Sequence, residues 1–209
     1  MNTEREFVYV IDDEAGVRKA LSRLLRAEGF EVRTFESATA FLGGYEDAGT
    51  ACLILDVSMP ELDGLELQRR LSRSKVQLPV IFLTGHGDIP MSVNAMKAGA
   101  ADFLTKPVND ADLLRAVRAA LRLAAVRNVE RATTDALTAR HSRLTPRERE
   151  VMEQVVAGKL NKQIAADLGT GEQNIKIHRG RVMEKMGVES LADLVRAAEK
   201  LSDRDQSSI

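Results

Sequence analysis

The first half of the chain alternates short apolar runs with segments in which apolar residues recur every three or four positions. The apolar runs predict five strands, at Phe7–Ile11, Val32–Phe35, Cys52–Leu55, Val80–Leu83 and Phe103–Leu104. The helical spacing predicts helices at Val17–Ala27, Ala38–Tyr45, Leu65–Leu71 and Met91–Ala98, with a longer one that begins near Asp110. Alternating strands and helices form βαβ units, so we expect an α/β fold with a doubly wound, five-stranded parallel sheet. Ligands of such sheets bind at the carboxyl ends of the strands.

The region from Asp110 to His141 contains neither Pro nor Gly and predicts a long helix. Its first part, Asp110–Leu123, should be the last helix of the first domain. The apolar stripe weakens beyond Arg127. The segment that follows is therefore either a dimerising linker or a solvated spacer, and the pattern fits both.

The second half of the chain shows helical spacing only. Thr145, Pro146 and Glu148 have the spacing of a capping box that starts a helix. The predicted helices are Arg147–Ala157, Asn161–Leu168, Glu172–Met186 and Leu191–Leu201. We therefore expect a first domain at residues 1–123, a helical linker at 124–142 and a small all-α domain at 143–209.

Composition and charge narrow the functional classes. The sequence has neither a signal-peptide pattern nor an apolar stretch of membrane-spanning length, so we expect a cytoplasmic protein without a membrane partner. The single cysteine, Cys52, lies in an apolar run and should be a buried, inert thiol. Residues 159–185 carry six basic and three acidic residues, a balance that suits a duplex-binding module or a solvated helix face.

Three carboxylates follow the predicted strands. Asp12 and Asp13 come directly after the first strand and Asp56 ends the third, and these two strand ends are neighbours in a doubly wound sheet. Carboxylates packed together repel, and a hard divalent cation, best Mg²⁺, relieves that repulsion. Thr84 ends the fourth strand and Lys106 follows the fifth, which adds a hydroxyl and an ammonium group. These are the groups that phosphoryl transfer to a carboxylate requires.

A single aspartate at a strand end is more often a turn former or a helix cap, and Asp13 alone could cap the helix that follows it. Capping does not explain five such groups at the ends of four strands. We therefore favour a site over separate structural roles.

The motifs that contain these residues resemble a response-regulator receiver domain over residues 5–123. They are Val-Ile-Asp12-Asp13-Glu, Leu-Ile-Leu-Asp56-Val-Ser-Met-Pro60-Glu-Leu-Asp-Gly64, Phe-Leu-Thr84-Gly and Asp-Phe103-Leu-Thr-Lys106-Pro107. The resemblance implies a flavodoxin-like fold in which Asp56 accepts a phosphoryl group from a phosphohistidine of a sensor histidine kinase. The implied ligands of Mg²⁺ are Asp12, Asp13, Asp56 and the backbone carbonyl of Ser58. Lys106 would contact the phosphoryl group, and the Lys106–Pro107 bond would be cis.

The resemblance also implies a switch. The Thr84 hydroxyl would move toward the phosphoryl group, and Phe103 would turn inward. Physically, the charge and acceptor oxygens of an aspartyl phosphate would bias the surface near the fourth and fifth strands. From residue type alone, Phe103 would instead be a static core aromatic.

Residues 161–186 read as a helix, a turn that contains glycine and a second helix, which is the form of a helix-turn-helix. On the second helix, the face expected to pack inward consists of Ile175, His178, Val182 and Met186. The face expected to enter the major groove of DNA consists of Gln173, Lys176, Ile177, Gly180 and Arg181. Lys176 and Arg181 would read guanine or hold phosphate, and Gln173 would read adenine. Lys162 and Arg179 would bind backbone phosphates.

Residues Leu144–Leu201 resemble the LuxR-type DNA-binding domain, from Leu-Thr-Pro-Arg-Glu through Asn-Lys-Gln-Ile-Ala to Lys-x-His. With the receiver in front, the whole chain resembles the NarL/FixJ class of response regulators, and the motif at residues 85–91 leans toward FixJ. Thr170, Gly171 and Asn174 depart from the usual turn, although Asn174 can still bind a DNA phosphate. These departures affect the DNA contacts and not the presence of the module.

Together the two halves predict a transcription regulator controlled by phosphorylation, and not a metabolic enzyme. Phosphorylation at Asp56 would pair two chains into a homodimer that fits two half-sites on double-stranded DNA, with RNA polymerase as a further partner. A Mg²⁺-dependent phosphohydrolase is one alternative, but it would usually carry an acid where Ser58 stands. A LuxR-type regulator that senses a small molecule is another, but it would leave the acidic groups without a role.

Overall fold

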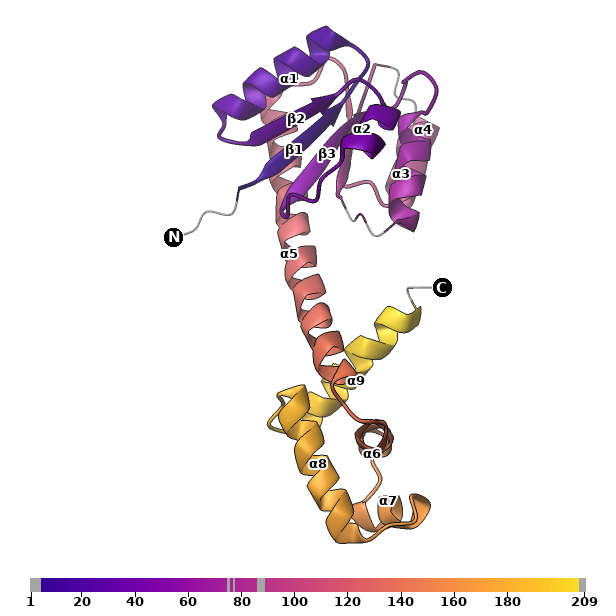
Figure 1. Cartoon of the computed structure of the whole chain (residues 1–209). Helices are drawn as coiled ribbons and strands as arrows, with labels where there is room; N and C mark the ends of the chain where they lie inside the picture. Colours follow the sequence, from indigo (N-terminus) through magenta and orange to yellow (C-terminus); the bar gives the residue numbers. More distant parts are fainter. Residues whose placement is uncertain (1–4, 75, 77, 86–88, 207–209) are drawn as a thin grey trace. The chain divides into compact units, whose positions relative to one another are not determined.

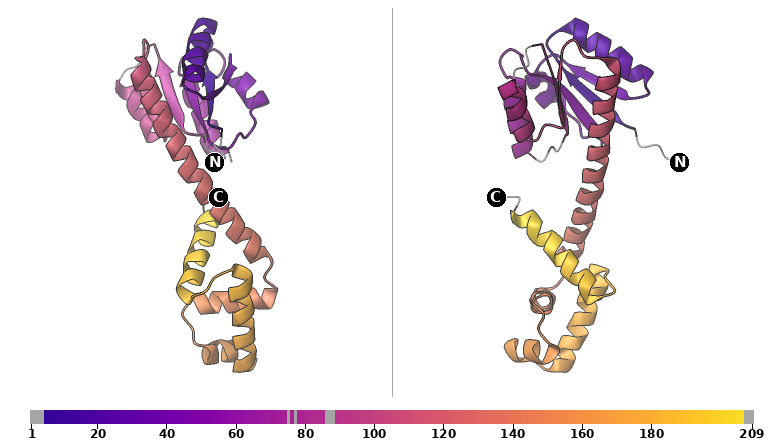
Figure 2. Two further views of the ribbon diagram at one scale, coloured as in Figure 1. Left: turned by 90° about the vertical axis from the view of Figure 1, so that its left-hand side faces the viewer. Right: turned by 180° about the vertical axis from the view of Figure 1, so that it is seen from behind.

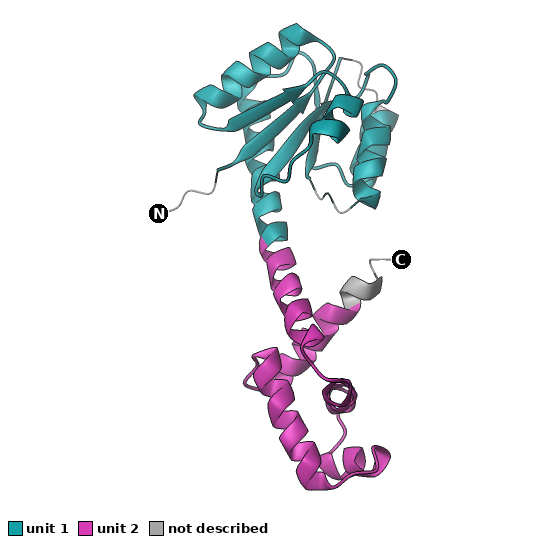
Figure 3. Cartoon of the chain, in the orientation of Figure 1, with its two compact units in different colours: residues 1–128 teal, residues 129–209 magenta. Residues whose placement is uncertain are grey.

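The computed structural model describes residues 5–74, 76, 78–85 and 89–206, so that His86, Gly87 and Asp88 of the motif at residues 85–91 lie outside the described residues. The chain divides into two compact units, residues 1–128 and residues 129–209 (Figure 3). The first unit has two hydrophobic cores, one on each face of its sheet, and the second unit has one.

The first unit is built on a parallel sheet of five strands in the order β2-β1-β3-β4-β5 (Figure 1). The strands are β1 (Phe7–Ile11), β2 (Glu31–Phe35), β3 (Ala51–Asp56), β4 (Val80–Thr84) and β5 (Asp102–Thr105). Every pair of neighbouring strands is parallel. The predicted doubly wound sheet is therefore confirmed, with β1 and β3 side by side at its centre.

Helices cover both faces of this sheet (Figures 1 and 2). They are α1 (Ala15–Ala27), α2 (Ala38–Gly44), α3 (Gly64–Arg73), α4 (Ile89–Lys97) and α5 (Asp110–Ser142). Leu21 of α1 and Val117 of α5 belong to one core, whereas Phe41 of α2 and Leu67 of α3 belong to the other. Because successive strand side chains point to opposite faces, Val8 and Tyr9 of β1 enter different cores.

The central strands are buried on both sides, which explains why their sequences are apolar throughout. Every residue of β3 and of β4 is buried. Cys52 lies on β3 with no exposed surface, and this burial raises the pKa of its thiol. The predicted buried cysteine is thus confirmed.

The second unit is helical. Its helices are α6 (Pro146–Val156), α7 (Asn161–Asp167), α8 (Glu172–Met186) and α9 (Leu191–Gln206), which follow the end of α5. The predicted capping box starts α6, because the amide of Glu148 donates to Thr145 Oγ1 at 3.3 Å and the amide of Thr145 donates to Glu148 Oε2 at 2.8 Å. Val151, Ile175 and Leu194 lie in the core that α6, α8 and α9 share.

Helix α5 supplies side chains to one core of the first unit and to the core of the second unit. Leu113 and Leu121 are buried against the sheet, and Leu137 packs against the core of the second unit. Near the end of α5, Arg140 Nη1 donates to the carbonyl oxygen of Met186 at 3.1 Å and so bonds to the last turn of α8. Among the described helices, none combines the length and the apolar character needed to cross a membrane.

Candidate functional site

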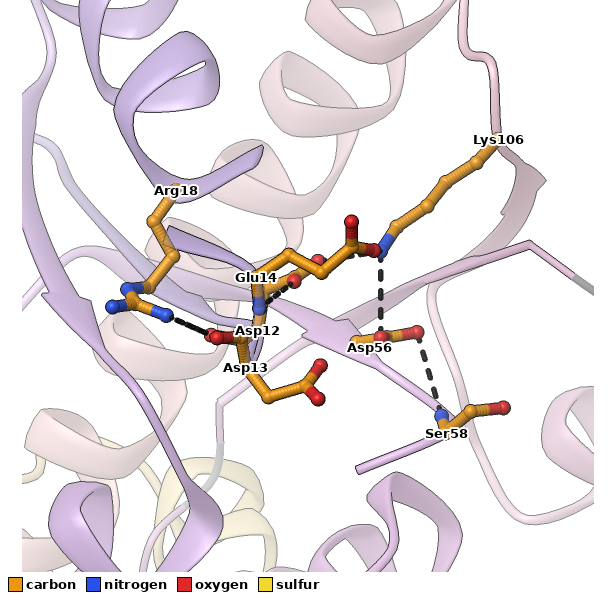
Figure 4. Close-up of polar contacts among 7 residues, drawn as sticks. All are labelled: Asp12, Asp13, Glu14, Arg18, Asp56, Ser58 and Lys106. Atoms are coloured by element: carbon orange, nitrogen blue, oxygen red, sulfur yellow. Dashed lines mark hydrogen bonds and ion pairs between the residues drawn. The ribbon is translucent and has the colours of Figure 1, made fainter. Parts of the chain in front are cut away.

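Three carboxylates meet at the carboxyl ends of β1 and β3 (Figure 4). Asp12 and Asp13 follow β1, Asp56 is the last residue of β3, and the two strands pair in register from Phe7 with Ala51 onward. One carboxylate oxygen from each of the three residues lies within 4.8 Å of the other two. Asp12 and Asp56 are buried, whereas Asp13 is exposed. The structure thus brings together the three acids that the sequence placed at one edge of the sheet.

Lys106 extends into this cluster from the end of β5 (Figure 4). Its Nζ lies 2.7 Å from Asp12 Oδ2, 3.3 Å from Asp56 Oδ2 and 3.4 Å from Glu14 Oε1. The amide of Lys106 donates to the carbonyl oxygen of Thr84 at 2.7 Å, which joins the ends of β4 and β5. The bond between Lys106 and Pro107 is cis, as the resemblance implied.

The charges in the cluster shift one another's protonation. Burial raises the pKa of Asp12, although the hydrogen bonds from Lys106 and from the amide of Glu14 oppose that rise. Burial alone would lower the pKa of Lys106, but the hydrogen bond to Asp12 and the charges of Asp12 and Asp56 outweigh it, so that its pKa is raised. Lys106 therefore carries its positive charge at neutral pH.

The side chain and the backbone of Asp12 are held by two residues that the sequence had not singled out. The amide of Glu14, the N-cap of α1, donates to Asp12 Oδ1 at 2.9 Å. Arg18 Nη1 donates to the carbonyl oxygens of Asp12 at 2.7 Å and of Asp13 at 2.9 Å. The aspartate that bonds to the start of α1 is thus Asp12, which leaves the exposed Asp13 carboxylate facing the cluster.

The segment after Asp56 turns tightly onto α3. The amide of Ser58 donates to Asp56 Oδ1 at 3.4 Å, and the amide of Gly64 donates to the carbonyl oxygen of Val57 at 3.0 Å. A Cβ atom on Gly64 would lie 2.3 Å from the carbonyl oxygen of Asp56. Only glycine fits at this contact, so residue 64 fixes how closely α3 approaches the acidic cluster. The sequence contained Gly64 in a motif but gave no sign of this contact.

Thr84 and Phe103 lie on the neighbouring strands β4 and β5. Thr84 ends β4 with no exposed surface, and its pair in the sheet register is Thr105. Phe103 on β5 is half-buried, and its ring centroid lies 6.2 Å from that of Phe82. The switch roles of Thr84 and Phe103 remain predictions.

In the second unit, α7 and α8 form the predicted helix-turn-helix. The inward face of α8 is confirmed, because Ile175, Val182 and Met186 are buried and His178 is half-buried. The outward face is confirmed as well, since all its members are exposed: Gln173, Lys176, Ile177, Gly180 and Arg181. In the turn, Gly171 is the N-cap of α8 and has no side chain that could cap it. Asn174 Nδ2 donates instead to Thr170 Oγ1 at 3.2 Å and steadies the turn.

The basic residues of the second unit fall into two groups. Lys159 pairs with Asp167 at 2.7 Å and Lys185 pairs with Glu148 at 2.6 Å. Arg179 is half-buried and its Nη1 donates to Asn161 Oδ1 at 3.2 Å. In contrast, Lys162, Lys176 and Arg181 are exposed and make no ion pair with any described residue. Lys176 and Arg181 belong to the outward face of α8, and Lys162 lies on α7.

The pair of Glu148 with Lys185 was not predicted. Glu148 is only 2 % exposed, and it also accepts from the amide of Thr145. The hydrogen bond from Lys185, followed by that from Thr145, lowers the pKa of Glu148 to about 2. The pair joins the start of α6 to the end of α8 across 37 positions of sequence, and so it holds the unit together without being available to a ligand.

Comparison with known proteins matches both units. Residues 8–118 match the family model of the response regulator receiver domain, and residues 142–198 match that of the bacterial regulatory proteins of the luxR family. The chain is 47 % identical to the response regulator protein TmoT of Ectopseudomonas mendocina over 97 % of this chain and 92 % of TmoT. It is 42 % identical to the transcriptional regulatory protein FixJ of Bradyrhizobium diazoefficiens over 94 % of this chain and 96 % of FixJ.

A solved structure is similar over nearly the whole length. The response regulator StyR has a TM-score of 0.81 and 45 % identity, over 94 % of this chain and 99 % of StyR. The two families imply two partners, a kinase that phosphorylates the receiver and DNA that binds the LuxR-type domain. The chain belongs to the two-component response regulators that join a receiver domain to a LuxR-type DNA-binding domain and control transcription.

Proposed function

We propose that Asp56 is the phosphoacceptor of this regulator and that its phosphorylation controls DNA binding by the second unit. The observation that carries the proposal is the contact of one cation with two buried acids, since Lys106 Nζ lies 2.7 Å from Asp12 and 3.3 Å from Asp56. In the transfer, a carboxylate oxygen of Asp56 bonds to phosphorus as the bond from phosphorus to the kinase histidine breaks. The histidine leaves with the electron pair of that bond and takes up a proton.

The donor set fits Mg²⁺, because three carboxylates that lie within 4.8 Å of one another offer the hard oxygen ligands that this ion prefers. Asp12, Asp13, Asp56 and the backbone carbonyl of Ser58 would hold it. Bound there, Mg²⁺ would neutralise the acids and the oxygens of the phosphoryl group.

The chain's own groups do the rest of the work at this edge. Lys106 holds its ammonium group beside Asp56, where it offsets the negative charge of the incoming phosphoryl oxygens. Thr84, buried at the end of β4, offers a hydroxyl to the same oxygens once the group is transferred. Movement of Thr84 leaves space beside β5 that the ring of Phe103 fills, which changes the surface that β5 and α4 present.

For the second unit, we propose that α8 enters the major groove of a DNA duplex. Gln173, Lys176, Ile177 and Arg181 contact bases or nearby phosphates, and Lys162, Asn174 and Arg179 bind the backbone. The exposed, unpaired state of Lys162, Lys176 and Arg181 supports this assignment, because phosphates attract free cations. A DNA site made of two half-sites would favour a homodimer, which forms on phosphorylation. The bound homodimer would recruit RNA polymerase. Both events would take place in the cytoplasm, where the DNA is.

Incubation of the full chain with acetyl phosphate and Mg²⁺ tests the phosphoacceptor. Intact-mass spectrometry should show one added phosphoryl group in the wild type and none in Asp56→Asn, because the amide is a far poorer nucleophile. Asp110→Asn, which changes a carboxylate at the start of α5 outside the cluster, is the control and should label normally. Equal labelling of wild type and Asp56→Asn would refute the assignment.

The same samples test the homodimer. Sedimentation of the labelled wild type should show about twice the mass of the unlabelled chain, whereas Asp56→Asn should remain unchanged under the same treatment. If the labelled wild type stays monomeric, the proposed homodimer is wrong, whereas the assignment of Asp56 as phosphoacceptor still holds.

A further inference from the structure

A glycine lies in the interior of the helix that we place in the DNA groove. Gly180 is eight positions from the start of α8 (Glu172–Met186), on an exposed part of the helix. Glycine in a helix interior is unfavourable, because it loses more backbone freedom on folding than alanine does. A glycine at this position therefore calls for a reason, either in the packing and backbone of the fold or in a contact with a ligand.

The residues that the structure describes give no such reason. A Cβ atom built on Gly180 meets no atom within 4 Å, and the residue does not have a positive φ. Gly187 at the end of α8 is the opposite case, because its φ is +63° and a Cβ there would lie 2.8 Å from Arg140 Nη1. The fold requires glycine at position 187 and would accept alanine at position 180.

The residues around Gly180 form an exposed face that suits contact with a polyanion. Gly180 shares the exposed face of α8 with Gln173, Ile177 and Lys176, opposite the buried Ile175. Ile177 is 45 % exposed and offers an apolar surface one helical turn from Gly180. A helix that carries a bare backbone patch between an apolar side chain and free cations can come very close to a groove.

We infer that Gly180 is a specificity-determining position that allows the backbone of α8 to lie directly against a base-pair edge. The inference rests on the proposed function of α8. Any side chain at position 180 would hold the helix farther out and weaken the contacts that depend on its depth, in the first place those of Ile177 with the methyl group of thymine. Contacts of long, flexible cations with phosphates depend less on that depth.

Gly180→Ala in the full chain separates this role from a structural one, because its two effects have opposite signs. Hydrogen exchange of the α8 amides should become about two- to fivefold slower, since alanine favours the helix. Binding to a duplex that the phosphorylated wild type selects from a random library should weaken about tenfold, as overpacking by one methyl group commonly does. Binding to a random duplex of equal length and labelling by acetyl phosphate should not change.

Gly43→Ala is the matched control, because Gly43 is exposed on α2 and a Cβ there also meets nothing within 4 Å. It should leave affinity for the selected duplex unchanged. If Gly180→Ala binds that duplex as the wild type does, or if its α8 amides exchange faster, the inference is wrong. If the wild type selects no duplex at all, it is the proposed function of α8 that fails.

Discussion

The two units place their charges in opposite ways. In the first unit, Asp12 and Asp56 are buried and Lys106 contacts both of them. In the second unit, Lys176 and Arg181 are exposed on α8 and form no ion pair with a described residue. One unit concentrates opposite charges at a single point, and the other leaves cations exposed on the surface of a helix.

The difference follows from what each site has to recognise. Burial of charges costs several kcal/mol of desolvation, roughly, and that cost is tolerable only where the groups are held in fixed positions for a reaction. Exposed cations cost almost no desolvation and attract a polyanion from a distance, at the expense of sensitivity to salt. Charges held in fixed positions are therefore suited to the transfer of a phosphoryl group, and exposed cations are suited to binding a DNA duplex.

A third arrangement lies between these two. Glu148 and Lys185 form a pair in the second unit, but the carboxylate is buried and also takes part in a capping box. Its lowered pKa belongs to the stability of the unit and not to ligand binding. Charged groups therefore have three roles in this chain, each of which a single substitution can test.

The largest effect is expected for Gly64→Ala. The new Cβ would lie 2.3 Å from the carbonyl oxygen of Asp56 and 3.1 Å from Cα of Val57, so the backbone that carries Asp56 has to move. We expect the free energy of unfolding of the first unit to fall by about 3 kcal/mol and labelling by acetyl phosphate to slow. Tyrosine fluorescence during denaturant unfolding measures this unit alone, because Tyr9 and Tyr45 are the two tyrosines of the chain.

Gly43→Ala again provides the control, because it makes the same chemical change without a nearby atom. Unfolding and labelling of Gly64→Ala that both match the wild type would show that the cluster does not depend on this close approach.

The next effect concerns Glu148→Gln, which keeps the capping box but removes the charge. We expect the second unit to lose about 2 kcal/mol of stability at neutral pH, because a hydrogen bond to a charged group is lost. The pKa of Glu148 is about 2 in the folded chain against an ordinary value of 4.5. The carboxylate therefore stabilises the fold fully above pH 4.5, and this contribution disappears as the pH falls toward 2.

Denaturant unfolding followed by far-ultraviolet circular dichroism at several pH values measures this difference. The difference in the free energy of unfolding between wild type and Glu148→Gln should become smaller as the solution becomes acidic. DNA binding by the variant at neutral pH should stay normal. A difference that is constant over the acid range would assign the stability to the shape of the side chain and not to its charge.

The smallest effect is expected for Lys176→Ala. Loss of one free cation should weaken binding to the selected duplex about tenfold and reduce the salt dependence of binding by about one counterion. The stability of the second unit should not change, because Lys176 is exposed and unpaired among the described residues. Titrations at several salt concentrations measure both quantities.

Lys200→Ala removes an exposed lysine from α9 and is the control for nonspecific loss of charge. Were the two variants to bind the duplex equally well, the contact surface would have to be sought away from α8.

Much of the fold could be predicted from local pattern. The strand predicted at Phe7–Ile11 has the bounds of β1, and the helix predicted at Glu172–Met186 has those of α8. Strands β3 and β4 were recognisable because burial on both faces leaves them apolar at every position. The meeting of Asp12 with Asp56 followed from topology, since the carboxyl ends of neighbouring parallel strands lie together.

The contacts that pattern could not predict join polar groups far apart in sequence. Lys106 meets Glu14 across 92 positions, and Lys185 meets Glu148 across 37. The hydrogen bond from Arg18 to the backbone of Asp12 and the close approach of Gly64 to Asp56 depend on the exact positions of the atoms in the folded chain. Periodicity reports which side of an element is apolar, but it has no signal for which polar atoms meet beyond that element.

Helix α5 has a practical consequence for dividing the protein. A fragment cut at the predicted start of the second domain, residue 143, would lack Leu137, whose side chain covers part of the second core, and Arg140, which bonds to Met186 at the end of α8. Such a fragment would expose an apolar surface and invite aggregation. A fragment that begins at residue 129 retains both side chains, and so it is the safer choice for expressing the DNA-binding half by itself.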